Sequence, residues 1–268
     1  MEAQERTRFG YATAKIAEVR QENYRVKTFV LDCGVEARPG QFAMVWIPGM
    51  DEKPMCIVND DPLTFSVAKV GPFSSKLHGL GAGDKISFRA PLGNSFAIPT
   101  GAKKIILVGG GYGVAALHFL ARVAKGKGVE PVMVVGARKR DDVIFEGDFA
   151  KLGVKTVVAT DDGSGGVKGT AIDAVRQLLD AGEKFDCAYA CGPEMMMHAL
   201  AAVAQKEDMA CQLSLERFMG CGIGICGKCD AGGGLVCQGG PVYNSRAAFK
   251  LEEFGICHRD TMGNKIRW

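Results

Sequence analysis

The periodicity of apolar residues changes once along this chain of 268 residues, at Gly101, and the change separates two kinds of structure. Before Gly101, short alternating or apolar runs such as residues 24–31, 41–47 and 63–70 are separated by glycine and proline turns. Several short strands without a convincing helix predict a small antiparallel β-barrel. After Gly101, apolar strands alternate with helical patterns about 10 to 13 residues long, which predicts a parallel α/β sheet.

The second region has a regular order of elements. An apolar strand at residues 103–108 is followed by a glycine turn and a helical run at 114–124. Further strands are expected at 129–135, 155–159 and 187–190, and helices at 170–181 and 195–206. From about Gln212 the periodicity dissolves into glycine and cysteine. We therefore expect three parts: a barrel in residues 1–99, an α/β domain in 100–210 and a cysteine-rich segment in 211–268.

Composition and charge exclude several classes of protein. Apolar residues make up 47% of the chain and charged residues 24%, which is ordinary for a folded soluble protein. The net charge is +3 and the longest basic run is Arg138-Lys139-Arg140, so we expect no nucleic-acid partner. The first ten residues are charged, and the most apolar stretch (105–123) contains glycines, His118 and Arg122. We expect neither a secretory signal nor a membrane span, and a cytoplasmic location.

Four of the ten cysteines lie within a stretch of 17 residues, 221–237. Cys221, Cys226, Cys229 and Cys237 have the pattern C-x4-C-x2-C-x7-C. The first three spacings are those of plant-type [2Fe–2S] proteins. The interleaved glycines permit the tight turns at positive φ with which a loop wraps a cluster. These four cysteines are the predicted ligands of a [2Fe–2S] cluster.

Other interpretations of the cysteines remain open. Four thiolates also suit Zn²⁺, although structural zinc sites favour two C-x2-C pairs and this chain has one. Four reduced cysteines without a metal are the third possibility. A disulfide framework is not expected, because such frameworks are spread through smaller, secreted chains.

A glycine-rich turn follows the first strand of the α/β region. Gly111-Tyr112-Gly113-Val114-Ala115-Ala116 fits G-x-G-x-x-G/A, where backbone N–H groups at a helix start can receive a pyrophosphate. Such turns are common in α/β domains, so the signal alone is weak. The acidic residue usual after the second strand is replaced by Gly136-Ala137-Arg138, so a standard Rossmann site is not expected.

Several segments resemble the ferredoxin–NADP⁺ reductase superfamily. Cys191-Gly192-Pro193 is the C-G-P signature at the end of a strand, and Thr160-Asp161-Asp162-Gly163-Ser164 is similar to a T-D-D/S-D-G-S loop. Residues 53–57 stand where the flavin motif is expected, with lysine for the usual arginine and cysteine for the usual hydroxyl residue near flavin N5. Lysine supplies a point charge without the bidentate fork of arginine. Residues 71–77 and 90–96 are similar to the flavin-diphosphate segment and the barrel-closing turn.

The superfamily resemblance implies FAD in the barrel and a nicotinamide nucleotide in the α/β domain. Cys191 would lie beside the nicotinamide and position it, and an adenosine phosphate could reach Arg138, so NAD and NADP stay open. The implied flavin contacts are Lys53, Pro54, Met55, Cys56, Val67, Ala68, Lys69, Phe73 and Ser74. The implied nicotinamide-nucleotide contacts are Gly109, Gly110, Gly111, Gly113, Asp161, Gly192 and Pro193.

Over nearly its whole length the chain resembles the electron-transfer subunit of dihydroorotate dehydrogenase (the PyrK family). Residues 215–226 are similar to that family's E-R-x-M-x-C-G-I-G-x-C, and residues 236–243 to V-C-x-D-G-P-V-F, with Gly239 where aspartate is usual. The resemblance implies that electrons pass between NAD(H), FAD, the [2Fe–2S] cluster and a separate FMN subunit that oxidises dihydroorotate in pyrimidine biosynthesis. It also implies a heterotetramer of two electron-transfer and two catalytic subunits, and no activity of this chain alone on dihydroorotate.

Two alternative functions remain. Small subunits of sulfhydrogenases and NADH-dependent ferredoxin:NADP⁺ transhydrogenases share the FAD, nicotinamide and [2Fe–2S] layout, so the partner and the direction of electron flow stay open. A zinc-stabilised binding module without redox activity belongs to another class, and it predicts a colourless protein that contains zinc and no iron.

Overall fold

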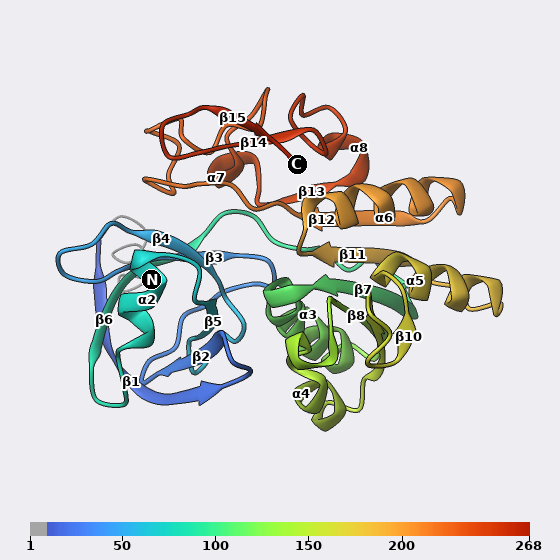
Figure 1. Cartoon of the computed structure of the whole chain (residues 1–268), viewed down its shortest axis with the longest axis horizontal. Helices are drawn as coiled ribbons and strands as arrows, with labels where there is room; N and C mark the ends of the chain where they lie inside the picture. The colour runs from blue at the N-terminus through green and yellow to red at the C-terminus, as the bar shows by residue number, and fades with distance from the viewer. Residues whose placement is uncertain (1–9) are drawn as a thin grey trace.

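An antiparallel half-barrel forms the first part of residues 10–268, which are the residues that the computed structural model describes (Figure 1). Its strands are β1 (Ala12–Gln21), β2 (Val26–Leu31), β3 (Phe42–Trp46), β4 (Lys53–Cys56), β5 (Thr64–Ala68) and β6 (Lys85–Leu92). They pair in the order β4-β3-β6-β1-β2-β5, each pair antiparallel. Phe29, Phe65 and Phe88 fill its core. The predicted antiparallel barrel architecture is confirmed.

A short helix, α2 (Pro72–His78), lies in this region, where the sequence pattern showed none. Proline begins it, at a position where the missing N–H costs no intrahelical bond. The Ser74 hydroxyl oxygen accepts hydrogen bonds from the N–H groups of Val70 and Gly71, at 2.9 and 3.0 Å. Phe73 and Leu77 enter the barrel core. The expectation of no helix was wrong, because about two turns of helix are too short for a periodic signal.

A seven-stranded sheet forms the second part, in the order β10-β9-β8-β7-β11-β12-β13. All its pairs are parallel except the last, between β12 and β13. Its strands are β7 (Lys104–Gly110), β8 (Glu130–Ala137), β9 (Lys155–Thr160), β10 (Val167–Lys168), β11 (Cys187–Cys191), β12 (Ala210–Ser214) and β13 (Val242–Asn244). The helices are α3 (Val114–Gly126), α4 (Glu146–Lys151), α5 (Ala171–Asp180) and α6 (Glu194–Lys206), with 3-10 turns at Gly111–Gly113 and Arg140–Asp142. The predicted parallel α/β sheet is confirmed.

Helices cover both faces of this sheet (Figure 1). Ile105 and Leu107 of β7 pack in the core that contains α3, whereas Ile106 and Val108 pack in the core that contains α5 and α6. Burial on both faces explains why β7 is an unbroken apolar run in the sequence. Within residues 10–268, none of the helices combines the length and the apolar character that crossing a bilayer requires.

The segment that follows β12 packs beside the sheet and the half-barrel, in orange and red in Figure 1. Its elements after the cysteine loop are α7 (Val236–Gly239), β13, α8 (Ser245–Ala248), β14 (Cys257–Arg259) and β15 (Lys265–Arg267). The strands β14 and β15 form an antiparallel hairpin. Because β12 and β13 belong to the parallel sheet, this sheet extends into residues 211–268. The domain boundaries at residues 99–100 and 210–211 stay predictions.

A buried ion pair joins α6 to the chain that enters the cysteine loop. Arg217 donates to both carboxylate oxygens of Glu194, and the two side chains are 1% and 2% exposed. The same carboxylate accepts hydrogen bonds from the Gly255 N–H at 2.8 Å and the Trp268 indole N–H at 3.3 Å. Four separate stretches of the chain therefore meet at one charged group.

We expect Arg217→Met to lower the free energy of unfolding by about 3–5 kcal/mol, because it leaves the buried Glu194 carboxylate without its counter-charge. Chemical denaturation of the variant and the unaltered protein measures the change. Arg176→Met is the control, since Arg176 and Asp173 form an exposed pair with a separation of 3.6 Å. Such a pair contributes less than about 1 kcal/mol. Equal losses in the two variants would contradict the role of the buried pair.

Candidate functional site

The glycine turn after β7 packs directly on the C-G-P segment after β11. A Cβ atom at Gly113 would lie 2.5 Å from the carbonyl oxygen of Cys191, and one at Gly110 would lie 2.5 Å from Pro193 Cδ. Gly192 adopts φ +145° with its backbone against Gly110. Only residues without Cβ permit this approach. The two motifs, about 80 residues apart in sequence, thus form one structural unit at the carboxyl edge of the sheet.

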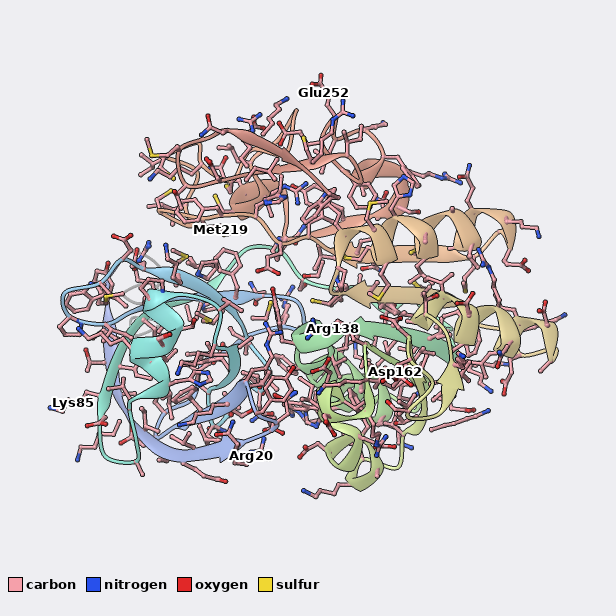
Figure 2. The ribbon with its side chains drawn as sticks, viewed as in Figure 1. Arg20, Lys85, Arg138, Asp162, Met219 and Glu252 are labelled. Atoms are coloured by element: carbon pink, nitrogen blue, oxygen red, sulfur yellow. The ribbon has the colours of Figure 1, made fainter. Side chains whose placement is uncertain are left out.

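A cavity of about 300 Å³ opens at this edge. It is lined on one side by the α/β domain and on the other by the half-barrel residues Asn23, Arg25 and Val26. Figure 2 shows Arg138, one of its lining residues, beside the junction of the two parts. Four of the predicted nicotinamide-nucleotide contacts line it: Gly110, Gly111, Asp161 and Pro193. The other four, Gly109, Gly113, Cys191 and Gly192, do not line it and belong to the backbone beneath or beside it.

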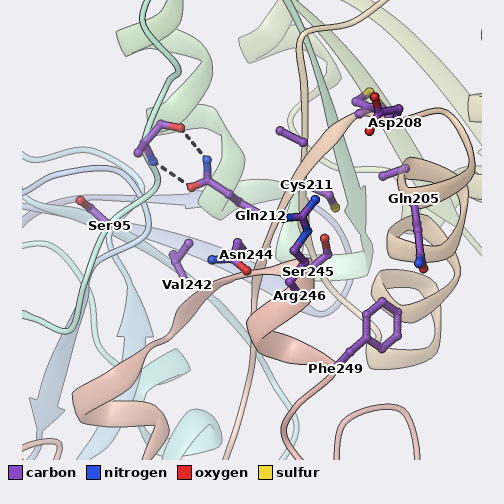
Figure 3. Close-up of a pocket in the computed structure, with 14 residues that line it drawn as sticks. Ser95, Gln205, Asp208, Cys211, Gln212, Val242, Asn244, Ser245, Arg246 and Phe249 are labelled. Atoms are coloured by element: carbon purple, nitrogen blue, oxygen red, sulfur yellow. Dashed lines mark hydrogen bonds between the residues drawn. The ribbon is translucent and has the colours of Figure 1, made fainter.

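A larger cavity, of about 940 Å³, lies between β12, α6 and α8 and contains none of the predicted site residues (Figure 3). Gln212 forms two hydrogen bonds with the backbone of Ala97, at 2.6 and 2.9 Å. These bonds, dashed in Figure 3, tie the edge strand β12 to the chain that leaves the half-barrel. The smaller cavity is the better candidate, because glycine backbone and charged residues converge there.

Two thiols meet where the half-barrel contacts the sheet. Cys56 ends β4 and Cys191 ends β11, and Cys56 lies close enough to Cys191 to raise its pKa. The Tyr112 hydroxyl lies 3.2 and 3.4 Å from the two carboxylate oxygens of Glu216, beside the same pair. The structure therefore brings together the residue predicted near flavin N5 and the residue predicted near the nicotinamide.

Tyr112 and Glu216 were not among the site residues predicted from the sequence. Both stand within motifs that were recognised, Tyr112 as the variable residue of G-x-G and Glu216 two residues after β12. Ligands in open α/β sheets bind outside the carboxyl ends of the strands. The position of Glu216 after a strand is therefore the signal that could have identified it.

The electrostatics of this cluster favour protonated groups. The Cys56 thiol, together with burial, raises the pKa of Cys191 well above its ordinary value. The Glu216 carboxylate, followed by burial, raises the pKa of Tyr112. Glu216 keeps exposed surface, yet the protein atoms crowded around it raise its pKa, against the lowering effects of Tyr112 and Arg217. At neutral pH, Cys191 and Tyr112 are therefore hydrogen-bond donors.

The predicted flavin contacts lie on two neighbouring stretches of the half-barrel. The four residues of β4 (Lys53, Pro54, Met55 and Cys56) are all half-buried, unlike the buried residues of β3. Val67 and Ala68 end β5, and Lys69 is exposed beyond them. Phe73 and Ser74 are buried in α2, and the Ser74 hydroxyl caps its own helix. The Lys53 ammonium lies 4.5 Å from the centre of the Phe218 ring, which precedes the cysteine loop.

The four predicted ligands gather in one loop as two pairs. Cys226 lies close enough to Cys221 to lower its pKa, and Cys229 close enough to Cys237 to raise its pKa. Cys229 and Cys237 are buried, Cys221 is half-buried and Cys226 is exposed. Within residues 10–268, no three His, Cys, Asp or Glu side chains converge so as to hold a single metal ion.

Backbone N–H groups point at these sulfurs. Cys221 Sγ accepts from the N–H groups of Ile223, Ile225 and Cys226 at 3.3 to 3.5 Å. Gly224 donates to Cys237 Sγ at 3.1 Å, and the Cys237 N–H donates to Cys229 Sγ at 3.4 Å. Gly222, Gly224 and Gly227 adopt positive φ, which aims these groups inward. Burial opposes ionisation of Cys221, but the N–H groups outweigh it and lower its pKa to about 7. Thiolate sulfurs that accept N–H bonds are the donor set of an iron–sulfur site.

Two solved structures that share this fold are named as electron-transfer proteins. The chain is 30% identical to the NADH-dependent reduced ferredoxin–NADP oxidoreductase of flavin-based electron bifurcation, with TM-score 0.79 over 89% of this chain and 90% of that one. Phthalate dioxygenase reductase shares the fold at 19% identity, with TM-score 0.59 over 73% of this chain and 64% of that one. The half-barrel and the parallel sheet are thus those of the ferredoxin–NADP⁺ reductase fold.

Curated relatives cover almost the whole chain, although no family model matches it. The chain is 41% identical over 254 residues to a probable dihydroorotate dehydrogenase B (NAD⁺) electron transfer subunit of Methanocaldococcus jannaschii, covering 94% of this chain and 96% of the relative. It is 40% identical over 262 residues to the corresponding protein of Methanothermobacter thermautotrophicus, covering 95% and 96%. The chain belongs to the family of dihydroorotate dehydrogenase B (NAD⁺) electron transfer subunits.

Proposed function

We propose that this chain carries electrons between NAD(H) and a partner catalytic subunit that oxidises dihydroorotate in pyrimidine biosynthesis. The observation that carries the proposal is the contact of three sites within one chain. The C-G-P edge of the sheet meets the end of β4 at Cys56 and Cys191, and the chain that leaves β12 beside them enters the cysteine loop. Family membership supports the same conclusion.

The nicotinamide nucleotide would bind in the cavity at the carboxyl edge of the sheet. Gly110 and Gly111 present backbone N–H groups without side chains, and Pro193 and Met196 supply an apolar wall. Arg138 and Arg25 are the cations available to phosphate groups there. NAD is proposed as the nucleotide because the named relatives are NAD⁺-linked.

FAD would bind along the half-exposed strand β4 and the end of β5, with the nine flavin contacts predicted from the sequence. When bound, FAD accepts a hydride and the [2Fe–2S] cluster takes one electron at a time, so together they link two-electron and one-electron chemistry. Cys56 and Cys191 would flank the place where the flavin and the nicotinamide meet. Tyr112 and Glu216, hydrogen-bonded to each other beside these thiols, would help to orient that contact.

The four cysteines would hold the [2Fe–2S] cluster, with one pair for each iron. Two pairs of thiols fit two irons better than a single Zn²⁺, which needs four donors around one point. The N–H groups directed at the sulfurs stabilise the thiolate form that an iron requires. Cys226 is exposed and Ile225 is 79% exposed, so this edge of the loop is open to a partner. We propose an FMN-containing catalytic subunit there, in an assembly of two subunits of each kind.

A second function is favoured by one comparison. The 30% identity and TM-score of 0.79 to the electron-bifurcating ferredoxin–NADP oxidoreductase extend over nearly all of both chains. A subunit of such a transhydrogenase would use the same three sites and a different partner. The partner therefore separates the two functions.

Affinity capture of the tagged chain from its native host tests the partner. We expect mass spectrometry to identify an FMN-dependent dihydroorotate dehydrogenase subunit in about one-to-one ratio. Capture with Ile225→Asp is the control, because a charge on this exposed apolar residue should weaken retention of the partner without unfolding the chain. Recovery of a transhydrogenase or hydrogenase subunit instead would keep the electron-transfer chemistry and overturn the role in pyrimidine biosynthesis.

We expect Cys226→Ser to abolish electron transfer from NADH to a one-electron acceptor while NADH still reduces the FAD. The serine removes one ligand of the exposed pair and leaves the nicotinamide cavity intact. Stopped-flow absorbance at flavin wavelengths and reduction of a one-electron dye measure the two steps separately. Cys257→Ser is the control, since Cys257 lies outside the loop and should retain both steps. Loss of flavin reduction in a folded Cys226→Ser protein would contradict the assignment.

We expect Glu216→Gln to slow reduction of the FAD by NADH about tenfold or more, because a hydrogen bond to a charged group contributes about 1.5–3 kcal/mol. Iron content should not change, since Glu216 makes no contact with the cysteines of the loop. Single-turnover kinetics at saturating NADH measures the rate. Glu207→Gln, in an exposed residue after α6, is the matched control. An unchanged rate would remove Glu216 from the hydride-transfer site.

A further inference from the structure

Arg89 is a nearly buried arginine that lies between the half-barrel and the cysteine loop. It belongs to β6, and its side chain is 8% exposed. Its Nε and Nη2 atoms donate to the two carboxylate oxygens of Glu52, at 2.9 and 2.5 Å. Glu52 is 11% exposed. The bidentate pair fixes the direction of the guanidinium plane.

The same guanidinium reaches the loop. Nη2 of Arg89 donates to the backbone carbonyl oxygen of Cys221 at 2.7 Å. The next residue, Gly222, presses against the half-barrel, because a Cβ atom there would lie 2.6 Å from Met44 Cγ. Cys221 is therefore held by a charged hydrogen bond on its carbonyl and by contact of its neighbour with β3. None of the other three ligands receives a hydrogen bond from an arginine within the described residues.

The positively charged guanidinium of Arg89 is hydrogen-bonded to Cys221, whose thiolate is one of the predicted cluster ligands. Reduction of an iron–sulfur cluster adds one negative charge to a group that its four thiolates already make anionic. A positive charge in a site with little water favours that reduction, and a negative charge opposes it. Glu52 partly offsets Arg89, but the guanidinium lies between the carboxylate and Cys221 and so dominates there.

We propose that Arg89 is a positioning residue for the ligand Cys221 and sets the reduction potential of the cluster, with Glu52 as its opposing charge. The inference rests on the proposed function, because it takes the four cysteines as cluster ligands. It adds that the half-barrel, and not only the loop, controls how readily the cluster accepts an electron. The opposite signs of the two charges give the proposal a two-directional test.

The experiment compares midpoint potentials in the full-length, iron-loaded, FAD-loaded protein. Redox titration followed by electron paramagnetic resonance reports the reduced cluster directly, without an activity assay. Arg89→Met should make reduction of the cluster at least tenfold less favourable, which is a downward shift of 59 mV or more for one electron. Glu52→Gln should shift the potential upward, since it keeps an acceptor for Arg89 and removes the negative charge.

Arg122→Met is the matched control. Arg122 pairs with Asp60 at the same 2.5 Å, lies on α3 and makes no hydrogen bond with the cysteine loop. Its removal should leave the potential unchanged. The flavin potential, read optically in the same titrations, serves as an internal reference for every variant.

Unchanged potentials in both Arg89→Met and Glu52→Gln, with iron and FAD retained, would overturn the inference and leave the proposed function standing. If the Arg89→Met protein loses its iron, the Glu52→Gln variant alone decides the test. A midpoint potential of its cluster that is equal to or lower than that of the unaltered protein overturns the inference. If the unaltered protein holds no iron after reconstitution, the cluster itself is absent, and the proposed function fails together with the inference.

Discussion

The close backbone contact between two glycine-rich turns is the constraint on which the site depends. Parallel strands bring their carboxyl ends to one edge, so β7 and β11, neighbours in the sheet, must end side by side. There the absence of side chains at Gly110, Gly113 and Gly192 lets the two turns touch. Any side chain at these positions would separate the turns and move Cys191 away from Cys56. The placement of Cys191 beside Cys56 therefore depends on glycine at these three positions.

Contacts between the half-barrel, the sheet and the cysteine loop, more than any one of these parts, place the predicted cofactor sites relative to one another. The half-barrel provides the strand β4 and the charged pair of Arg89 and Glu52. The sheet provides Cys191 and Glu216, and the loop provides the four thiols. Glu194 and Arg217 fasten the entrance of the loop to α6. Each of these contacts joins residues far apart in sequence, so the relative placement of the predicted cofactor sites follows from how the parts pack.

The sequence predicted the parts of this structure better than the contacts between them. The strand and helix pattern, the C-G-P turn and the spacing of the cysteines are local signals, and the observed strands and helices largely agree with the first of them, whereas the cysteine ligands stay a prediction. The pairing of Tyr112 with Glu216, and of Arg89 with Glu52, depends on tertiary packing that spacing does not reveal. Ser74 is a case in which local structure, and not tertiary packing, was missed. Its hydroxyl looked available to a ligand, but it is engaged by the short helix that the pattern did not show.

The strand β12 has a consequence for how such a chain could have been assembled in evolution. It is the last parallel strand of the sheet and also the chain that leads into the cysteine loop, and β13 returns from beyond the loop to pair with it. The cysteine loop therefore lies between two paired strands of the sheet. Cuts after Ser214 and before Val242 would leave both strands with their sheet, and an exchanged loop would have to supply a partner for Glu194 in place of Arg217. A cut ahead of β12 would carry away two strands and expose the edge of β11.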